Sequence, residues 1–232
     1  MKRLNRFVFR ALLLASTVAF AADDKPVATQ PNDQHAVQIT IDTTETPELA
    51  DWAQTELRPV LEKWYPIIEK DLASDGYTPP QKFKVVFFKD MKGVANTSGS
   101  LVRCAAPWFK RNLKGEAIGA VVHEMVHVVQ QYPSGKNNPG WLVEGTADYI
   151  RWFKYEPVLS RPHVDPSRAK YTDSYRTSAA FLNFVVEAHD RHFVKKLNAV
   201  MREGKYNPDV WKELTGKTVD ELWDEYIATL KQ

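Results

Sequence analysis

Hydrophobic and polar positions follow different periods in the two halves of the chain. Val37, Ile39 and Ile41 alternate with polar residues, and residues 83–88 (FKVVFF) form a more apolar run, so both segments are predicted strands. Between them, apolar residues recur at helical spacing over 47–68, where two internal prolines predict kinks. The first part of the chain is therefore expected to supply a small sheet and one long helix.

After the second strand, helical periods dominate. Residues 92–100 are small and polar and predict a bend, and 101–109 are expected to be extended. Residues 156–174 carry three prolines and little periodicity, which predicts a long ordered loop. Helices are expected at residues 116–131, 141–155, 175–189, 191–203, 207–214 and 218–231. Strands followed by helices indicate one α+β domain with a small mixed sheet and a mainly helical C-terminal half.

The start of the chain has the composition of an export signal. The cationic residues are Lys2, Arg3, Arg6 and Arg10. An apolar run over 11–22 follows, and residues 19–21 (AFA) fit a signal peptidase site. The run would rise only about 18 Å as a helix, and Arg10 separates it from the earlier apolar residues, which disfavours an uncleaved anchor. We expect residues 1–21 to be a signal peptide and the protein to be secreted or periplasmic, with no stable membrane insertion after cleavage.

Composition and charge narrow the class further. With 44% apolar and 26% charged residues over 232 positions, the chain is neither disordered, fibrous nor a multi-span membrane protein. Loss of residues 1–21 would change the formal net charge from +2 to −2, which gives no reason to expect nucleic acid or an anionic membrane as a partner. Residues 22–36 are polar and predict a flexible lead-in to a domain over 37–232.

The stretch VVHEMVHVVQ, residues 121–130, carries the candidate chemistry. His123 and His127 are one helical turn apart, so both imidazoles can reach one cation, and Zn²⁺ suits neutral imidazole. Glu124 lies about 100° round the helix, where it can act as general base on a water and then pass the proton to the leaving amine. The alternative is a pair of core histidines in a buried, valine-rich helix.

A second pair of acids lies on the next predicted helix, WLVEGTADY, residues 141–149. Glu144 and Asp148 share one face, and their apolar neighbours disfavour a solvated one. The extended metzincin motif is excluded, because it needs glycine and histidine at the positions of Gln130 and Pro133.

This layout resembles the gluzincin group of zinc peptidases, whose third ligand is a glutamate on the following helix. The resemblance implies a zincin-like fold in which His123, His127 and Glu144 hold Zn²⁺. It also implies that Asp148 hydrogen-bonds the free nitrogen of His123, which would fix the tautomer of that ligand.

Four segments also resemble the plant and bacterial basic secretory protein family of metallopeptidases: HEMVHVVQ, WLVEGTADYIR, SYRTSAAFL and ELTGKTVDELWDEY. The resemblance extends over residues 37–230 and implies an exported, zincin-like protein that acts on peptides or proteins. The chain departs from the family in charge, since without residues 1–21 it is not basic.

Hydrolysis of an amide also needs a donor for the oxyanion. By resemblance to the family's Y-x-x-x-A-x-F-L stretch, Tyr175 is the first choice, followed by Tyr171, Tyr149 and His163; the alternative for Tyr175 is simple packing at a helix start. Zincins present an edge strand to the bound peptide, and residues 101–109 are expected to supply it.

Two small residues near the predicted site, Cys104 and Gly145, are interpreted as packing residues. Cys104 is the single cysteine, so any metal must be held by His, Asp or Glu, and the thiol is interpreted as a buried apolar group. Gly145 predicts close packing against the motif helix.

The leading function is a zinc-dependent endopeptidase; a non-catalytic metal-containing binding or defence protein and a hydrolase of cell-wall peptides remain open. The sequence does not indicate the oligomeric state.

Overall fold

The fold is known from a computed structural model that describes residues 37–133, 137–157 and 164–231. The predicted signal peptide and lead-in, together with His163, lie outside the described residues. Among the residues that are described, none of the helices is both long and apolar enough to cross a bilayer.

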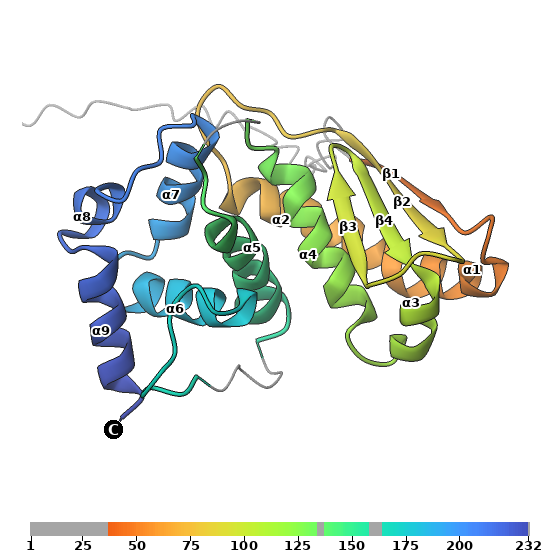
Figure 1. The fold of residues 1–232 in the computed structure, drawn as a ribbon. Helices are drawn as coiled ribbons and strands as arrows, with labels where there is room; N and C mark the ends of the chain where they lie inside the picture. The colour runs from red at the N-terminus through yellow and green to blue at the C-terminus, as the bar shows by residue number, and fades with distance from the viewer. Residues whose placement is uncertain (1–36, 134–136, 158–163, 232) are drawn as a thin grey trace, which may run out of the picture. The chain divides into compact units, whose positions relative to one another are not determined.

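A mixed four-stranded sheet has the order β1-β2-β4-β3 (Figure 1). The strands are β1 (Gln38–Asp42), β2 (Lys82–Phe88), β3 (Ala95–Ser98) and β4 (Leu101–Ala105). β1, β2 and β4 run parallel, and β3 pairs antiparallel with β4. Alternate side chains of β2 are buried, with Phe83, Val85 and Phe87 inside. The strand predicted from alternation, the strand predicted from the apolar run over 83–88 and the small mixed sheet are confirmed.

Two predictions near the sheet are wrong. The expected bend over 92–100 contains the edge strand β3, and the expected extended segment 101–109 is a strand only to Ala105. Pro107 then occupies the first turn of helix α3 (Ala106–Asn112), where its missing N–H leaves no helical hydrogen bond unmade. Because β4 lies inside the sheet, the edge strand next to the motif helix is β3 and not the segment 101–109.

The helical stretch before β2 is unbroken along the chain, but its type changes between 3₁₀, α and π helix. It consists of a 3₁₀ turn (Pro47–Leu49), α1 (Ala50–Trp52), a π turn (Ala53–Leu57) and α2 (Arg58–Asp71). Pro59 stands in the first turn of α2, directly after the π turn, while Pro66 lies inside the helix. Tyr65 of α2 stacks on Phe83 with ring centroids 5.2 Å apart, which fixes the helix against the sheet.

The remaining helices match the predicted ranges within a few residues. They are α4 (Ala117–Gln130), α5 (Gly140–Tyr149) with a π-helical continuation η4 (Ile150–Tyr155), α6 (Tyr175–Ala188), α7 (Phe193–Arg202), α8 (Val210–Thr215) and α9 (Val219–Thr229). Within the predicted loop, residues 164–174 form turns without helix or strand. α4 packs on β3 and β4 on one side and on α5 on the other, and α5 packs along α6 (Figure 1).

The packing of Gly145 corrects another expectation. A Cβ atom at this position would lie 2.7 Å from the Cβ of Ser178, which belongs to α6. Gly145 therefore permits close approach of α5 to α6 and does not face the motif helix α4.

Candidate active site

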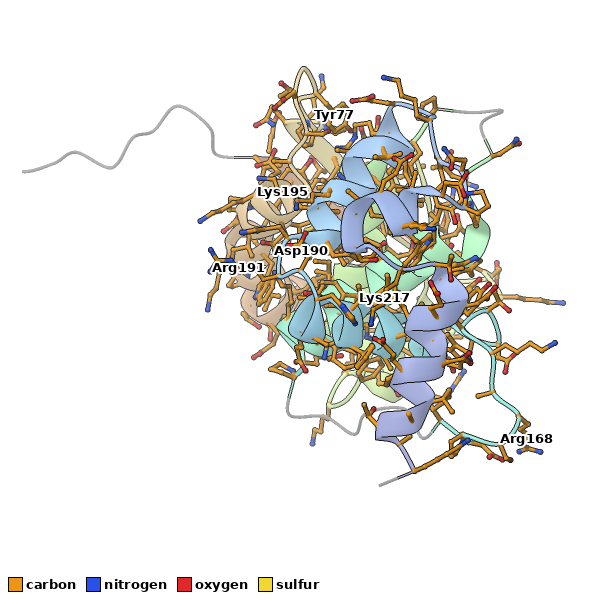
Figure 2. All side chains as sticks on the ribbon, turned by 90° about the vertical axis from the view of Figure 1, so that its left-hand side faces the viewer. Tyr77, Arg168, Asp190, Arg191, Lys195 and Lys217 are labelled. Atoms are coloured by element: carbon orange, nitrogen blue, oxygen red, sulfur yellow. The ribbon has the colours of Figure 1, made fainter. Side chains whose placement is uncertain are left out.

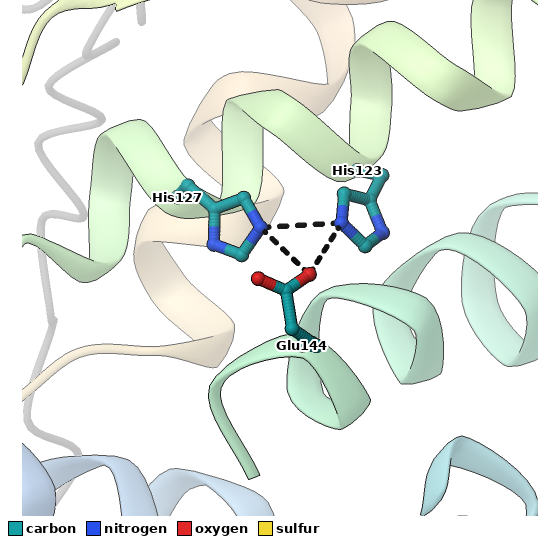
Figure 3. A group of neighbouring side chains, drawn as sticks. All are labelled: His123, His127 and Glu144. Carbon is teal, nitrogen blue, oxygen red and sulfur yellow. Dashed lines mark hydrogen bonds and ion pairs between the residues drawn. The ribbon is translucent and has the colours of Figure 1, made fainter. Parts of the chain in front are cut away.

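The motif helix α4 brings its two histidines to the face that meets α5. Valines of α4 are buried in the core and leave His123 and His127 partly accessible, one helical turn apart. Glu144 of α5 points at both imidazoles (Figure 3). Its Oε2 lies 3.1 Å from Nε2 of His123 and 3.4 Å from Nε2 of His127, and the two Nε2 atoms are 3.1 Å apart.

Each imidazole is oriented through its other nitrogen. Nδ1 of His123 lies 2.7 Å from Oδ1 of Asp148, and Nδ1 of His127 lies 2.7 Å from Oε1 of Gln130. With an N–H at each Nδ1 donating to these oxygens, the lone pair of each Nε2 is directed toward Glu144. Asp148 is thus placed where the gluzincin resemblance expects it.

The three ligand atoms fit a divalent metal ion. They lie within 4.8 Å of one another and combine two imidazole nitrogens with one carboxylate oxygen, a set that zinc accepts. Zinc–ligand bonds of about 2.0–2.2 Å in a tetrahedron separate neighbouring ligand atoms by roughly 3.3–3.6 Å. The separations between Glu144 and the two imidazoles are close to this spacing, so a zinc ion needs little rearrangement of these side chains.

Without a metal, the same groups pair as acid and base. Burial favours the neutral imidazole of His123, but its hydrogen bonds to Asp148 and Glu144 outweigh burial and raise its pKa to about 9. Burial also favours neutral Glu144, yet the hydrogen bonds to His123 and His127 lower its pKa to about 2. A metal ion that binds here therefore displaces a proton from an imidazole.

Glu124 is held beside this centre by the edge strand. Its side chain is buried, and the hydroxyl of Thr97 on β3 donates a hydrogen bond of 2.7 Å to Oε2. The carboxylate lines the same cavity as the two histidines without belonging to the three-ligand group. This arrangement holds a carboxylate, a possible proton acceptor, next to the candidate metal site.

A cavity of about 870 Å³ contains all of these groups. β3 forms one wall, and the side chains of Arg151, Trp152, Tyr175 and Arg176 form one end. Tyr175 is 54% exposed, and its ring centroid lies 6.4 Å from that of His123. The charge of Glu144 is the main cause that raises the pKa of Tyr175, whose hydroxyl is protonated at neutral pH even without this shift and can donate.

The two runners-up for the oxyanion donor that lie among the described residues, Tyr171 and Tyr149, are not brought to the cavity. Tyr171 packs on Trp141 and donates to Asp220, and Tyr149 stacks on Phe153. Neither tyrosine lines the cavity. Cys104 is fully buried, which confirms its interpretation as a small apolar core residue.

Two residues of the site were not found by sequence reasoning. Gln130 orients His127, and its spacing of three residues on one helix is a signal that could have identified it. Thr97 holds Glu124 across 27 positions of the chain, and no pattern in its own segment marks it. The first contact lies within one helix, whereas the second exists only because the fold brings β3 against α4.

Comparison with known proteins places the chain in a family. Residues 29–226 match the family BSP, described as a peptidase of plants and bacteria. The chain belongs to this family. The BSP match confirms the resemblance to basic secretory proteins. It identifies the chain as a member of a peptidase family, and the substrates of peptidases are peptides or proteins. Neither a curated protein nor a solved structure matched the chain.

Proposed function

We propose that this BSP family member is an exported, zinc-dependent peptidase of the gluzincin type with a zincin-like fold. The observation that carries the proposal is the convergence of His123 Nε2, His127 Nε2 and a Glu144 oxygen. Hydrogen bonds through Nδ1 orient the two imidazoles, and the carboxylate of Glu144 carries the charge opposite to that of a cation. These three residues would hold Zn²⁺, and Asp148 and Gln130 would keep the imidazoles in the ligating tautomer. When bound, zinc supplies a Lewis acid that lowers the pKa of a water to about 7.

The chain's own groups account for the movement of protons. The Glu124 carboxylate accepts the proton of the attacking water and returns it to the leaving amine, while Thr97 keeps the carboxylate in one rotamer. The Tyr175 hydroxyl donates to the carbonyl oxygen of the scissile bond as that oxygen gains negative charge. Its exposure at the cavity rim allows it to reach a bound substrate.

Glu124 also separates this proposal from a non-catalytic, metal-containing binding or defence protein. A structural metal site has no use for a buried carboxylate that does not bind the ion. A hydrolase of cell-wall peptides would use the same groups, so that alternative differs only in its substrate.

The decisive experiment compares the wild-type chain with Glu124→Gln after zinc loading. Glutamine accepts the Thr97 hydrogen bond but cannot take a proton, so hydrolysis of casein should fall by at least about 100-fold while one zinc per chain remains. The exposed glutamate of α8, changed as Glu213→Gln, is the matched control and should keep full turnover. Equal turnover in Glu124→Gln and wild type would contradict the assigned base.

Export is tested separately. Expression of the full chain in a bacterial host should yield an exported protein whose N-terminal sequence begins at Ala22, after the AFA site. Retention of residues 1–21 in the exported protein would contradict the predicted signal peptide.

A further inference from the structure

One end of the cavity carries a group of two arginines and one tryptophan that the proposed chemistry does not use. The guanidinium groups of Arg151 and Arg176 both lie against the ring of Trp152, with their Cζ atoms 4.1 Å and 4.0 Å from its centroid. Arg151 and Trp152 belong to the π-helical segment η4, and Arg176 belongs to the first turn of α6. π-helical turns are uncommon and concentrate at functional sites.

The charges of this group are distributed unevenly between the cavity and its surroundings. Oε2 of Glu116 accepts hydrogen bonds from Arg151 at 2.8 Å and from Arg176 at 3.1 Å, and Glu156 accepts one from Arg151 at 3.1 Å. The two arginines line the cavity, but the two glutamates do not. The lining at this end therefore includes the two cationic side chains but not the two carboxylates that pair with them.

The two arginines differ in what they can do. The side chain of Arg151 is only 10% exposed and lies between Glu116 and Glu156, which makes it a positioning residue. The side chain of Arg176 is 43% exposed and adjoins Tyr175. Stacking on an aromatic ring leaves the edge of a guanidinium, which carries its N–H groups, open to a planar carboxylate.

We propose that Arg176, stacked on Trp152, binds a carboxylate of the peptide substrate at this end of the cleft. The proposal rests on the proposed peptidase function and adds a substrate class to it: peptides with a carboxylate close to the cleaved bond. The carboxylate comes either from an acidic side chain or from the free C-terminus of the peptide. Arg176 thereby determines specificity, while Glu116 and Arg151 hold its guanidinium at the cavity wall.

The test is a positional scan with zinc-loaded enzyme and internally quenched peptides. Each position on both sides of the cleaved bond carries Glu or Gln in turn, in peptides with a free or an amidated C-terminus. We expect one position, or the free C-terminus, to raise kcat/KM by about tenfold, since charge-assisted pairs are the stronger hydrogen bonds. Arg176→Gln should abolish this preference, and Arg176→Glu should reverse it toward Lys.

The chain offers a matched control for these variants. Arg168 projects from the surface, with 84% of its side chain exposed, and does not line the cavity (Figure 2). Arg168→Gln removes the same charge and should keep the carboxylate preference unchanged. A wild-type enzyme that cleaves peptides without any carboxylate preference, or a preference that survives in Arg176→Gln, overturns the proposal.

A binding arm separates this proposal from the peptidase function. Zinc-loaded Glu124→Gln is titrated calorimetrically with the preferred carboxylate peptide and its amide counterpart, or with the whole peptide set if no peptide is cleaved. Tighter binding of the carboxylate peptide by about tenfold, lost when Arg176→Gln is added, supports the site even if turnover fails. Equal binding of both peptides overturns it even if turnover succeeds.

Discussion

The two histidines of α4 are oriented by chemically different partners. His123 contacts the Asp148 carboxylate, whereas His127 contacts the amide oxygen of Gln130. Gln130 is 2% exposed, and its Nε2 donates to the backbone oxygen of Val143 on α5, at 3.1 Å. Gln130 therefore ties the second imidazole to the helix that carries Glu144, without adding charge to the centre.

Replacing Gln130 tests this role. Gln130→Leu keeps the volume but removes the acceptor for Nδ1 of His127, so zinc affinity should fall by about 10–100-fold. Competition with a chromophoric chelator measures the dissociation constant. Gln130→Glu keeps an acceptor oxygen and should retain more of the affinity than the leucine variant. An unchanged dissociation constant in Gln130→Leu would show that the contact does not orient the ligand.

The single cysteine gives a second prediction at the same scale. Burial raises the pKa of the Cys104 thiol, and the negative charge of Glu124 raises it further. At pH 8 almost no thiolate forms and no reagent reaches it, so Ellman's reagent should not react with the folded chain. In urea, one thiol per chain should react. Rapid labelling under native conditions would contradict the burial of β4.

At the scale of elements, the contact between α5 and α6 depends on one missing side chain. Gly145→Ala places a Cβ atom 2.7 Å from Ser178, where backbone or neighbours must shift. We expect the free energy of unfolding to fall by about 1–3 kcal/mol, despite the better helix propensity of alanine. Urea unfolding measures the change.

The same helix contains its own control. A Cβ atom at Gly140, the first residue of α5, meets nothing within 4 Å. Gly140→Ala should leave stability unchanged or raise it by up to about 1 kcal/mol. Equal losses in both variants would mean that glycine matters for the backbone of α5 and not for its approach to α6.

Elements with strong periodicity could be predicted from sequence, and weak ones could not. β2 is a short apolar run and α4 carries a dense apolar face, so both were expected within one or two residues. β3 has the sequence ANTS, in which nothing alternates, and it forms only because β4 offers a partner. The prediction of an extended segment as far as residue 109 was wrong, because Pro107 lies in the first turn of a helix there.

The candidate site follows the same division. Spacing alone brought His123 and His127 together, and resemblance supplied Glu144 and Asp148. Thr97 was not predicted as a site residue, because its position depends on the pairing of β3, which the sequence does not indicate. Contacts within one helix are encoded locally, whereas contacts between elements require the fold.

At the scale of the whole described unit, the candidate metal centre joins two packing systems. α4 packs on the sheet through β3 and β4, and α5 packs on α6 and so on the helical part (Figure 1). The ligands come from α4 and α5, so a bound ion links the sheet side to the helical side. Metal binding should therefore stabilise the unit as a whole and not one helix alone.

Thermal unfolding with and without zinc tests this coupling. At 100 times the dissociation constant, zinc should add about 2.7 kcal/mol to the free energy of unfolding and raise the unfolding temperature by roughly 5–10 °C. Glu144→Ala removes the ligand supplied by α5, so the chain should stay folded but lose this shift. Glu213→Ala, an exposed glutamate of α8, should keep it. If Glu144→Ala retains the full zinc-dependent shift, the ion is held elsewhere and α5 does not contribute the third ligand.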